Sequence, residues 1–96
     1  MNRLRITRHS GYTLKTEYLD PLEMSAGKLA KELGLRRERI ERLVKGTTPI
    51  TADTALRLGR YFGTTPQFWM NLQIDYDLVS TAGKIDLSGI KPMDAG

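Results

Sequence analysis

The chain has 96 residues, of which 40% are hydrophobic and 27% are charged, and its formal net charge is +4. This length predicts a single domain with one core, and no apolar run is long enough to predict a membrane span. The chain has no cysteine and only one histidine. Disulfides and thiolate metal sites are therefore excluded, and few nucleophile–base pairs are available to an enzyme. We expect a cytoplasmic protein with no catalytic or metal site.

The chain is predicted to begin with a flexible basic arm over residues 1–11, which closes at Gly11. No apolar segment follows its arginines, so we do not expect a secretory signal. Either the arm has a function of its own, or it is a disordered terminus that improves solubility. Its basic residues are Arg3, Arg5 and Arg8.

A first helix is predicted by three apolar residues that recur every four positions, Leu14, Tyr18 and Leu22. Pro21 disfavours helical backbone at the residue before it. We therefore expect this helix to loosen near Asp20.

Two further helices follow, joined by a tight turn. Ser25 is a good N-cap for the second helix, and Gly34 tolerates the positive φ that such turns require. The third helix is predicted from about Arg36 to Lys45 and ends at Gly46. The residues expected to fill the wedge between the two helices are Leu29, Ala30, Leu33, Leu35, Ile40 and Leu43.

The last two predicted helices have clear start signals. Thr51 caps the fourth helix, and Thr65 followed by Pro66 starts the fifth. The fifth helix presents Trp69, Leu72, Tyr76 and Val79 on its apolar face and ends near Gly83. The sequence thus predicts an all-α domain of five helices over residues 12–83, followed by an extended or disordered tail over residues 84–96.

Basic residues are concentrated in the second and third helices. The stretch from Ser25 to Gly46 contains seven basic and three acidic side chains, which accounts for the whole net charge of +4. A basic face on a helix-turn-helix is typical of proteins that bind DNA. The alternative is an ordinary αα-hairpin in a small helical bundle.

In such motifs the second helix lies in the major groove, with its N-terminal residues nearest the base edges. Arginine bonds guanine and glutamate accepts from cytosine, so Arg37, Glu38 and Arg42 are the candidate base readers, beside Arg36. Intrahelical pairs Glu38–Arg42 and Glu41–Lys45, or simple solvation, are the alternative roles. The candidates for phosphate contacts are Ser25, Lys28, Arg39, Lys45, Thr47 and Thr48.

Large apolar side chains cover more than one side of the fifth helix. They either complete the core of one chain or form a homodimer contact, since aromatic residues and methionine are enriched at interface centres. A dimer is expected because two recognition helices about 34 Å apart meet successive major-groove turns. We expect the fifth helix and the tail to build it, and the candidate interface residues are Phe68, Trp69, Met70 and Tyr76.

Two segments resemble known families. The helix-turn-helix of lambda-repressor-like phage regulators is similar to "KLAKELGLRRERIERLVKG". The HigA-type antitoxins of bacterial toxin–antitoxin modules, also called virulence-associated protein I, resemble "ITADTALRLGRYFGTTPQFWMNLQIDYDL" and the closing "KIDLSGI". The resemblance covers His9 to Ile90.

The resemblance implies a dimeric repressor, not an enzyme, that binds an inverted repeat of double-stranded operator DNA and needs no cofactor. It further implies that the protein neutralises a small mRNA-cleaving toxin of the HigB type. The recognition-helix positions it indicates are Arg36, Arg37, Glu38, Arg39 and Arg42. A stand-alone transcriptional repressor without a toxin is the alternative function. A protein–protein adaptor is a further one, which the charge pattern disfavours.

Overall fold

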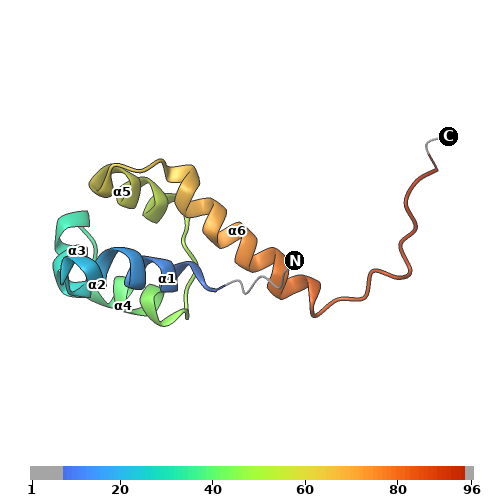
Figure 1. Cartoon of the computed structure of the whole chain (residues 1–96), viewed down its shortest axis with the longest axis horizontal. Helices are drawn as coiled ribbons and strands as arrows, with labels where there is room; N and C mark the ends of the chain where they lie inside the picture. The colour runs from blue at the N-terminus through green and yellow to red at the C-terminus, as the bar shows by residue number, and fades with distance from the viewer. Residues whose placement is uncertain (1–7, 95–96) are drawn as a thin grey trace.

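A computed structural model describes residues 8–94 of the chain, so the arginines at positions 3 and 5 of the predicted arm lie outside the described residues. The first helix has three continuous parts, α1 (Ser10–Thr13), the π-helical η1 (Leu14–Leu19) and α2 (Asp20–Leu22). Then follow α3 (Ala26–Leu33), α4 (Arg37–Lys45), α5 (Ala52–Phe62) and α6 (Pro66–Ala82). Residues 8–94 thus form five helices and no strand, which confirms the predicted all-α fold (Figure 1).

The helices are arranged as a compact body with one long projection. Helices α1 to α5 pack together, whereas α6 begins against them and then runs outward, and residues 83–94 bend at its end and extend further from the body (Figure 1). The molecule therefore measures 54 Å along its longest axis and 25 and 23 Å along the others. None of the helices among residues 8–94 is long and apolar enough to span a membrane.

The predicted helix ends are confirmed by their hydrogen bonds. The hydroxyl of Ser25 accepts from the backbone N–H of Lys28 at 3.0 Å, and Thr65 accepts from the N–H of Phe68 at 3.1 Å. Gly34 ends α3 with φ of 72°, the left-handed conformation that glycine adopts without strain. Because these signals act within a few residues, they are readable from sequence alone.

The expectation that the first helix loosens near Asp20 is wrong. Asp20 is helical, with φ of −62° and ψ of −50°, and its N–H bonds to the carbonyl of Lys15, five residues back. Proline has no N–H, and its ring crowds the carbonyl four residues earlier. The wider π turn ahead of Pro21 relieves that crowding, so the chain stays helical through the proline.

The π turn also changes which side chains reach the core. It holds more residues per turn than an α-helix, so Leu14 and Leu19, five residues apart, are both buried. Leu22, expected to face inward with Leu14, is 56% exposed. Tyr18 still packs inward, with its ring centroid 4.7 Å from that of Phe62.

Helix α1 crosses α4 at Gly11, where the two backbones nearly touch. A Cβ atom added to Gly11 would lie 1.7 Å from the carbonyl oxygen of Leu43. Ser10 and Gly11 are both buried, so the first helix begins before the predicted domain boundary at residue 11. Gly11 is thus required by close packing, whereas the sequence indicated only the end of an arm.

Trp69 lies in the core of the single chain. It is 0% exposed, and its indole N–H donates to the hydroxyl of Thr64 at 2.7 Å. Its ring packs beside those of Tyr18, at 5.0 Å, and Phe62, at 6.1 Å. Trp69 thus completes the core of one chain, the first of the two roles considered from the sequence, because the inward face of α6 places it against the first helix and α5.

A buried polar cluster ties α6 to the N-terminal part of the chain. The side-chain oxygen of Gln73 accepts from the hydroxyl of Ser10 at 2.6 Å and from the N–H of Ile50 at 2.8 Å. Its amide nitrogen donates to Asp77 at 2.9 Å. One side chain thus joins α1, the segment before α5, and α6.

His9 caps the first helix. Its Nδ1 accepts from the N–H of Gly11 at 3.0 Å, and its ring meets Tyr76 edge-on at 5.1 Å. Burial lowers the pKa of His9, although the nearby Asp77 carboxylate acts in the opposite direction. The lowered pKa favours the neutral ring, the form whose Nδ1 can accept this hydrogen bond.

Candidate nucleic-acid interface

The outer face of α4 presents the candidate base readers to solvent. Ile40 and Leu43 are buried on the inner face, whereas Arg37, Glu38 and Arg42 are all exposed. The helical repeat places residues 38 and 42 on the side of α4 opposite its apolar stripe, whereas Arg37 lies at the edge of that side, beside Gly27 of α3. The helix therefore offers Glu38 and Arg42 on its outer face, with Arg37 exposed at the edge of that face.

The ion pairs on this face differ from the pairs that the sequence allowed. Arg37 pairs with Glu41, with 3.3 Å between Nε and Oε2. Within residues 8–94, neither Glu38–Arg42 nor Glu41–Lys45 forms an ion pair. An exposed pair four residues apart stabilises a helix by only about 0.3–0.5 kcal/mol. Arg37 can therefore exchange its partner for a ligand at little cost.

Arg39 is engaged within the chain. Its Nη2 donates to the hydroxyl of Thr54 at 2.8 Å and lies 3.8 Å from a carboxylate oxygen of Asp53. These contacts join α4 to the first turn of α5. The predicted phosphate contact of Arg39 would have to compete with them.

The other predicted phosphate residues surround the ends of α3 and α4. The hydroxyl of Ser25 is used as a cap, and Lys28 pairs with Glu32 at 2.8 Å, a hydrogen bond that raises the pKa of Lys28. The hydroxyl of Thr47 donates to the carbonyl of Arg42 at 3.1 Å. Lys45 is exposed, and Thr48 is half-buried in the loop that follows.

A positively charged hollow of about 680 Å³ lies between the start of α4 and α5. Its lining includes one acidic side chain, Glu38, and four arginines, Arg36, Arg39, Arg42 and Arg57. Arg36, at the N-cap of α4, makes no capping hydrogen bond through its side chain. The arrangement suits an anionic ligand that approaches α4 from outside.

Arg57 was not among the sequence candidates. Its Nε bonds to Asp53, four residues earlier in α5, at 2.5 Å, and its Nη1 donates to the carbonyl of Leu33 at 2.7 Å. The spacing of Asp53 and Arg57 is a signal for the first contact. The second contact depends on how α5 packs against α3, which no local pattern reveals.

A family model described as helix-turn-helix matches residues 16–69, more than half of the chain. The chain belongs to the helix-turn-helix family. Within this family it is of the HigA type: it is 33% identical to antitoxin HigA-1 of Vibrio cholerae serotype O1, over 86% of this chain and 80% of the relative.

Other helix-turn-helix relatives agree with this placement. Virulence-associated protein I of Dichelobacter nodosus is 51% identical over 73% of this chain, and the match spans 65% of that relative. Pseudomonas aeruginosa antitoxin HigA, solved with the higBA promoter, has a TM-score of 0.85 and 35% identity over 93% of this chain and all of its own.

A further Pseudomonas aeruginosa protein, solved in complex with its operator DNA, has a TM-score of 0.89 and 34% identity, over 94% of this chain and all of its own. The helix-turn-helix relatives named above are antitoxins and DNA-binding regulators. The family is not an enzyme family, in agreement with the sequence analysis.

Proposed function

We propose that the protein is the antitoxin of a toxin–antitoxin module, which binds operator DNA as a dimer and neutralises a small mRNA-cleaving toxin in the cytoplasm. One observation carries the DNA-binding part. The outer face of α4 exposes Arg37, Glu38 and Arg42, in a fold shared with an antitoxin HigA solved with promoter DNA.

The proposed roles follow from the chemistry of the side chains. Arg37 and Arg42 carry guanidinium groups that match guanine, and Glu38 accepts from the cytosine amino group. Lys45 and the backbone near Thr47 lie at the far end of α4, where they would contact phosphate. Such phosphate contacts fix position on the duplex without reading its sequence.

We expect Arg37→Ala and Lys45→Ala to weaken DNA binding in different ways. Arg37→Ala should cost about 1–3 kcal/mol on the operator and relax the preference at one base position. Lys45→Ala should weaken binding to all duplexes alike and reduce the salt slope by about one. Fluorescence anisotropy on a selected operator and on a random duplex, at several salt concentrations, measures both effects.

Arg60→Ala is the matched control, because Arg60 is an exposed cation of α5, outside both α4 and the proposed dimer surface. It removes the same charge and should leave the operator preference intact. Equal losses for Arg37→Ala and Lys45→Ala on operator and random DNA would contradict the assigned roles.

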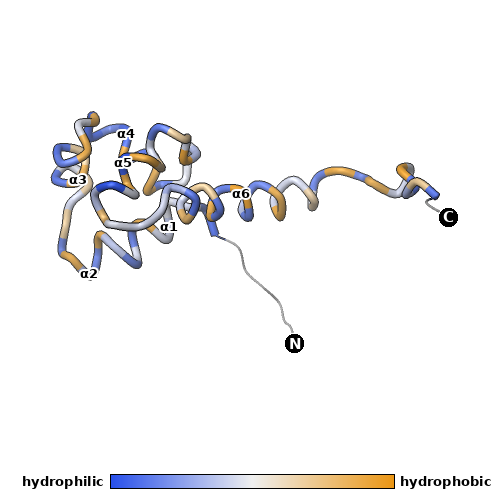
Figure 2. The backbone as a smooth tube through the Cα atoms, turned by 90° about the horizontal axis from the view of Figure 1, so that it is seen from above, coloured by the Kyte–Doolittle hydropathy of each residue, from blue (hydrophilic) through white to orange (hydrophobic). Residues whose placement is uncertain are grey.

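The dimer is proposed to form through the outer half of α6 and the tail. Ile74, Leu78 and Val79 are 46%, 64% and 56% exposed, and apolar residues recur along this projection (Figure 2). Contiguous exposed apolar surface of this kind commonly marks an interaction site. Of the interface candidates from the sequence, Phe68 is 37% exposed, while Met70 and Tyr76 are half-buried.

The toxin partner separates the antitoxin from the alternative, a stand-alone repressor. We expect co-expression with the small open reading frame beside its gene to restore growth, and the two proteins to co-elute in size-exclusion chromatography. The neighbouring frame expressed alone is the control and should arrest growth. A harmless neighbour that does not bind would favour the stand-alone repressor.

A further inference from the structure

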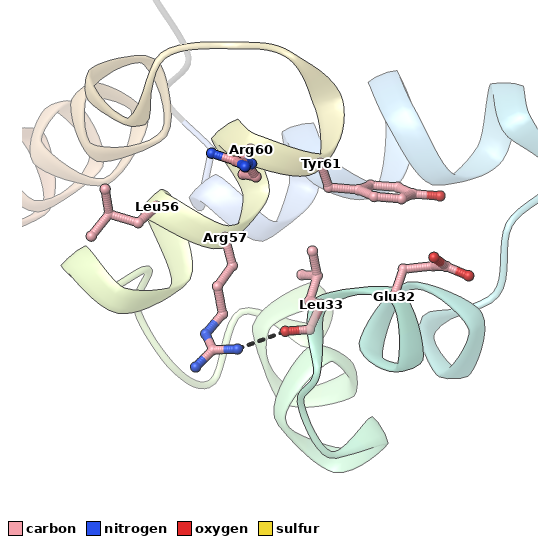
Figure 3. Close-up of a pocket in the computed structure, with 6 residues that line it drawn as sticks. All are labelled: Glu32, Leu33, Leu56, Arg57, Arg60 and Tyr61. Atoms are coloured by element: carbon pink, nitrogen blue, oxygen red, sulfur yellow. Dashed lines mark hydrogen bonds between the residues drawn. The ribbon is translucent and has the colours of Figure 1, made fainter.

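Arg57 connects α5 to the turn of the helix-turn-helix. Figure 3 shows the Arg57 side chain extending from α5 to the backbone of Leu33, whereas Arg60 of the same helix does not reach α3. Leu33 is the last residue of α3, and its carbonyl is one of those that a helix leaves without an internal partner. The Nη1 of Arg57 meets that need at 2.7 Å.

Asp53 links this contact to α4. One oxygen of Asp53 accepts from Nε of Arg57 at 2.5 Å, and the other lies 3.8 Å from Nη2 of Arg39. The same Nη2 donates to Thr54, which is only 3% exposed. The first half of α5 thus holds the end of α3 and the first turn of α4 at once.

This attachment matters because the start of α4 has little local support. Arg36 occupies the N-cap of α4 and makes no side-chain capping bond there, whereas Ser25, Thr51 and Thr65 cap their own helices. The turn itself is held to α3 by backbone bonds such as that from the N–H of Leu35 to the carbonyl of Ala30 at 2.8 Å. No side chain caps α4, however, so the placement of its first turn depends also on packing and on the bonds from α5. Arg37 and Glu38 are the first two residues of the helix that this attachment steadies.

We propose that Arg57, acting with Asp53, is a positioning residue that sets the placement of the first turn of α4 and thereby the base preference of Arg37 and Glu38. The proposal rests on the proposed DNA binding by α4. Arg57 positions the first turn of α4 through its planar guanidinium group, whose Nε bonds to Asp53 and whose Nη1 bonds to Leu33 in fixed directions. Lysine carries a single ammonium on a flexible stem and does not reproduce that geometry.

The test compares Arg57→Met and Arg57→Lys with Arg60→Met. Arg60 lies about one helical turn after Arg57 in α5, is exposed, and forms no ion pair within residues 8–94. Arg60→Met therefore removes a guanidinium group from the same helix but leaves the bonds of Arg57 to Asp53 and Leu33 in place. Each variant is titrated with a selected operator and a random duplex, below its melting temperature.

We expect Arg57→Met to reduce the ratio of operator to random affinity about ten-fold, comparable to the loss of one base contact, with the salt slope unchanged. Arg57→Lys should lose most of the same preference, and Arg60→Met should keep it. Equal weakening on both duplexes with a flatter salt slope would make Arg57 a phosphate contact and overturn the proposal. A lower melting temperature with an unchanged affinity ratio would overturn it too.

Hydrogen exchange tests the attachment without DNA. Arg57→Met should speed exchange of the amides of Leu35 and Arg39, whose N–H groups bond to the carbonyls of Ala30 and Arg36, relative to Arg60→Met, while the amides of α6 keep their protection. Unchanged exchange at Leu35 and Arg39 would overturn the positioning role, whatever the DNA titrations give. A wild-type protein that binds no duplex would contradict the proposed function, and it would be recognised before any variant is compared.

Discussion

Gly11→Ala is expected to lower the free energy of unfolding by about 3 kcal/mol, the upper end of what overpacking a protein interior costs. The added methyl group would lie 1.7 Å from the carbonyl oxygen of Leu43 and 2.6 Å from its carbonyl carbon. Both atoms belong to the backbone of α4, so no side-chain rotation relieves the clash. The first helix and α4 must move apart, which opens the core on that side.

Chemical denaturation of Gly11→Ala and wild type, followed by circular dichroism, measures the effect. Gly89→Ala is the control, because nothing lies within 4 Å of the Cβ position at Gly89. Its unfolding free energy should match that of the wild type. A Gly11→Ala protein as stable as Gly89→Ala would show that α1 and α4 do not approach each other in this way.

Gln73→Leu is expected to destabilise the fold by about 2–4 kcal/mol, because it leaves two buried groups without a partner, each costing about 1–3 kcal/mol. These groups are the hydroxyl of Ser10 and the backbone N–H of Ile50, in residues that are 0% and 2% exposed. Leucine is close to glutamine in size, so the loss reports the hydrogen bonds more than the packing.

Thermal and chemical unfolding of Gln73→Leu should be compared with Gln67→Leu, an exposed position of the same helix. The control introduces the same residue on the outer face and should change stability little. Adding Ser10→Ala to Gln73→Leu should recover part of the loss, because it removes one of the unpaired groups. Independent, additive losses would show that Ser10 and Gln73 are not coupled.

Sequence signals predicted the helices well wherever the determining contacts are local. The caps at Ser25, Thr51 and Thr65 and the glycine that ends α3 are confirmed by hydrogen bonds within four residues. The predicted split of α4 into an inner apolar face and an outer basic face is confirmed for the same reason. A helical repeat and a cap are properties of a short stretch of chain.

The remaining features depend on contacts between distant parts of the chain. The role of Gly11 needs the backbone of α4, and the bond from Arg57 to Leu33 joins residues 24 positions apart. The aromatic residues of α6 looked alike in sequence. Only the placement of the first helix and α5 separates the buried Trp69 from the partly exposed Phe68. The π turn accompanies Pro21 and the burial of both Leu14 and Leu19. None of these three residues predicts it alone.

The π turn in the first helix also bears on how relatives of this chain should be aligned. Between Leu14 and Leu19 the helix accommodates one residue more than a regular α-helix would place between two neighbours on the same face. A relative that lacks this extra residue would differ by a deletion inside a helix, with its core positions retained. An alignment that allows gaps only in loops would then misplace every residue from the N-terminal cap to η1 by one position.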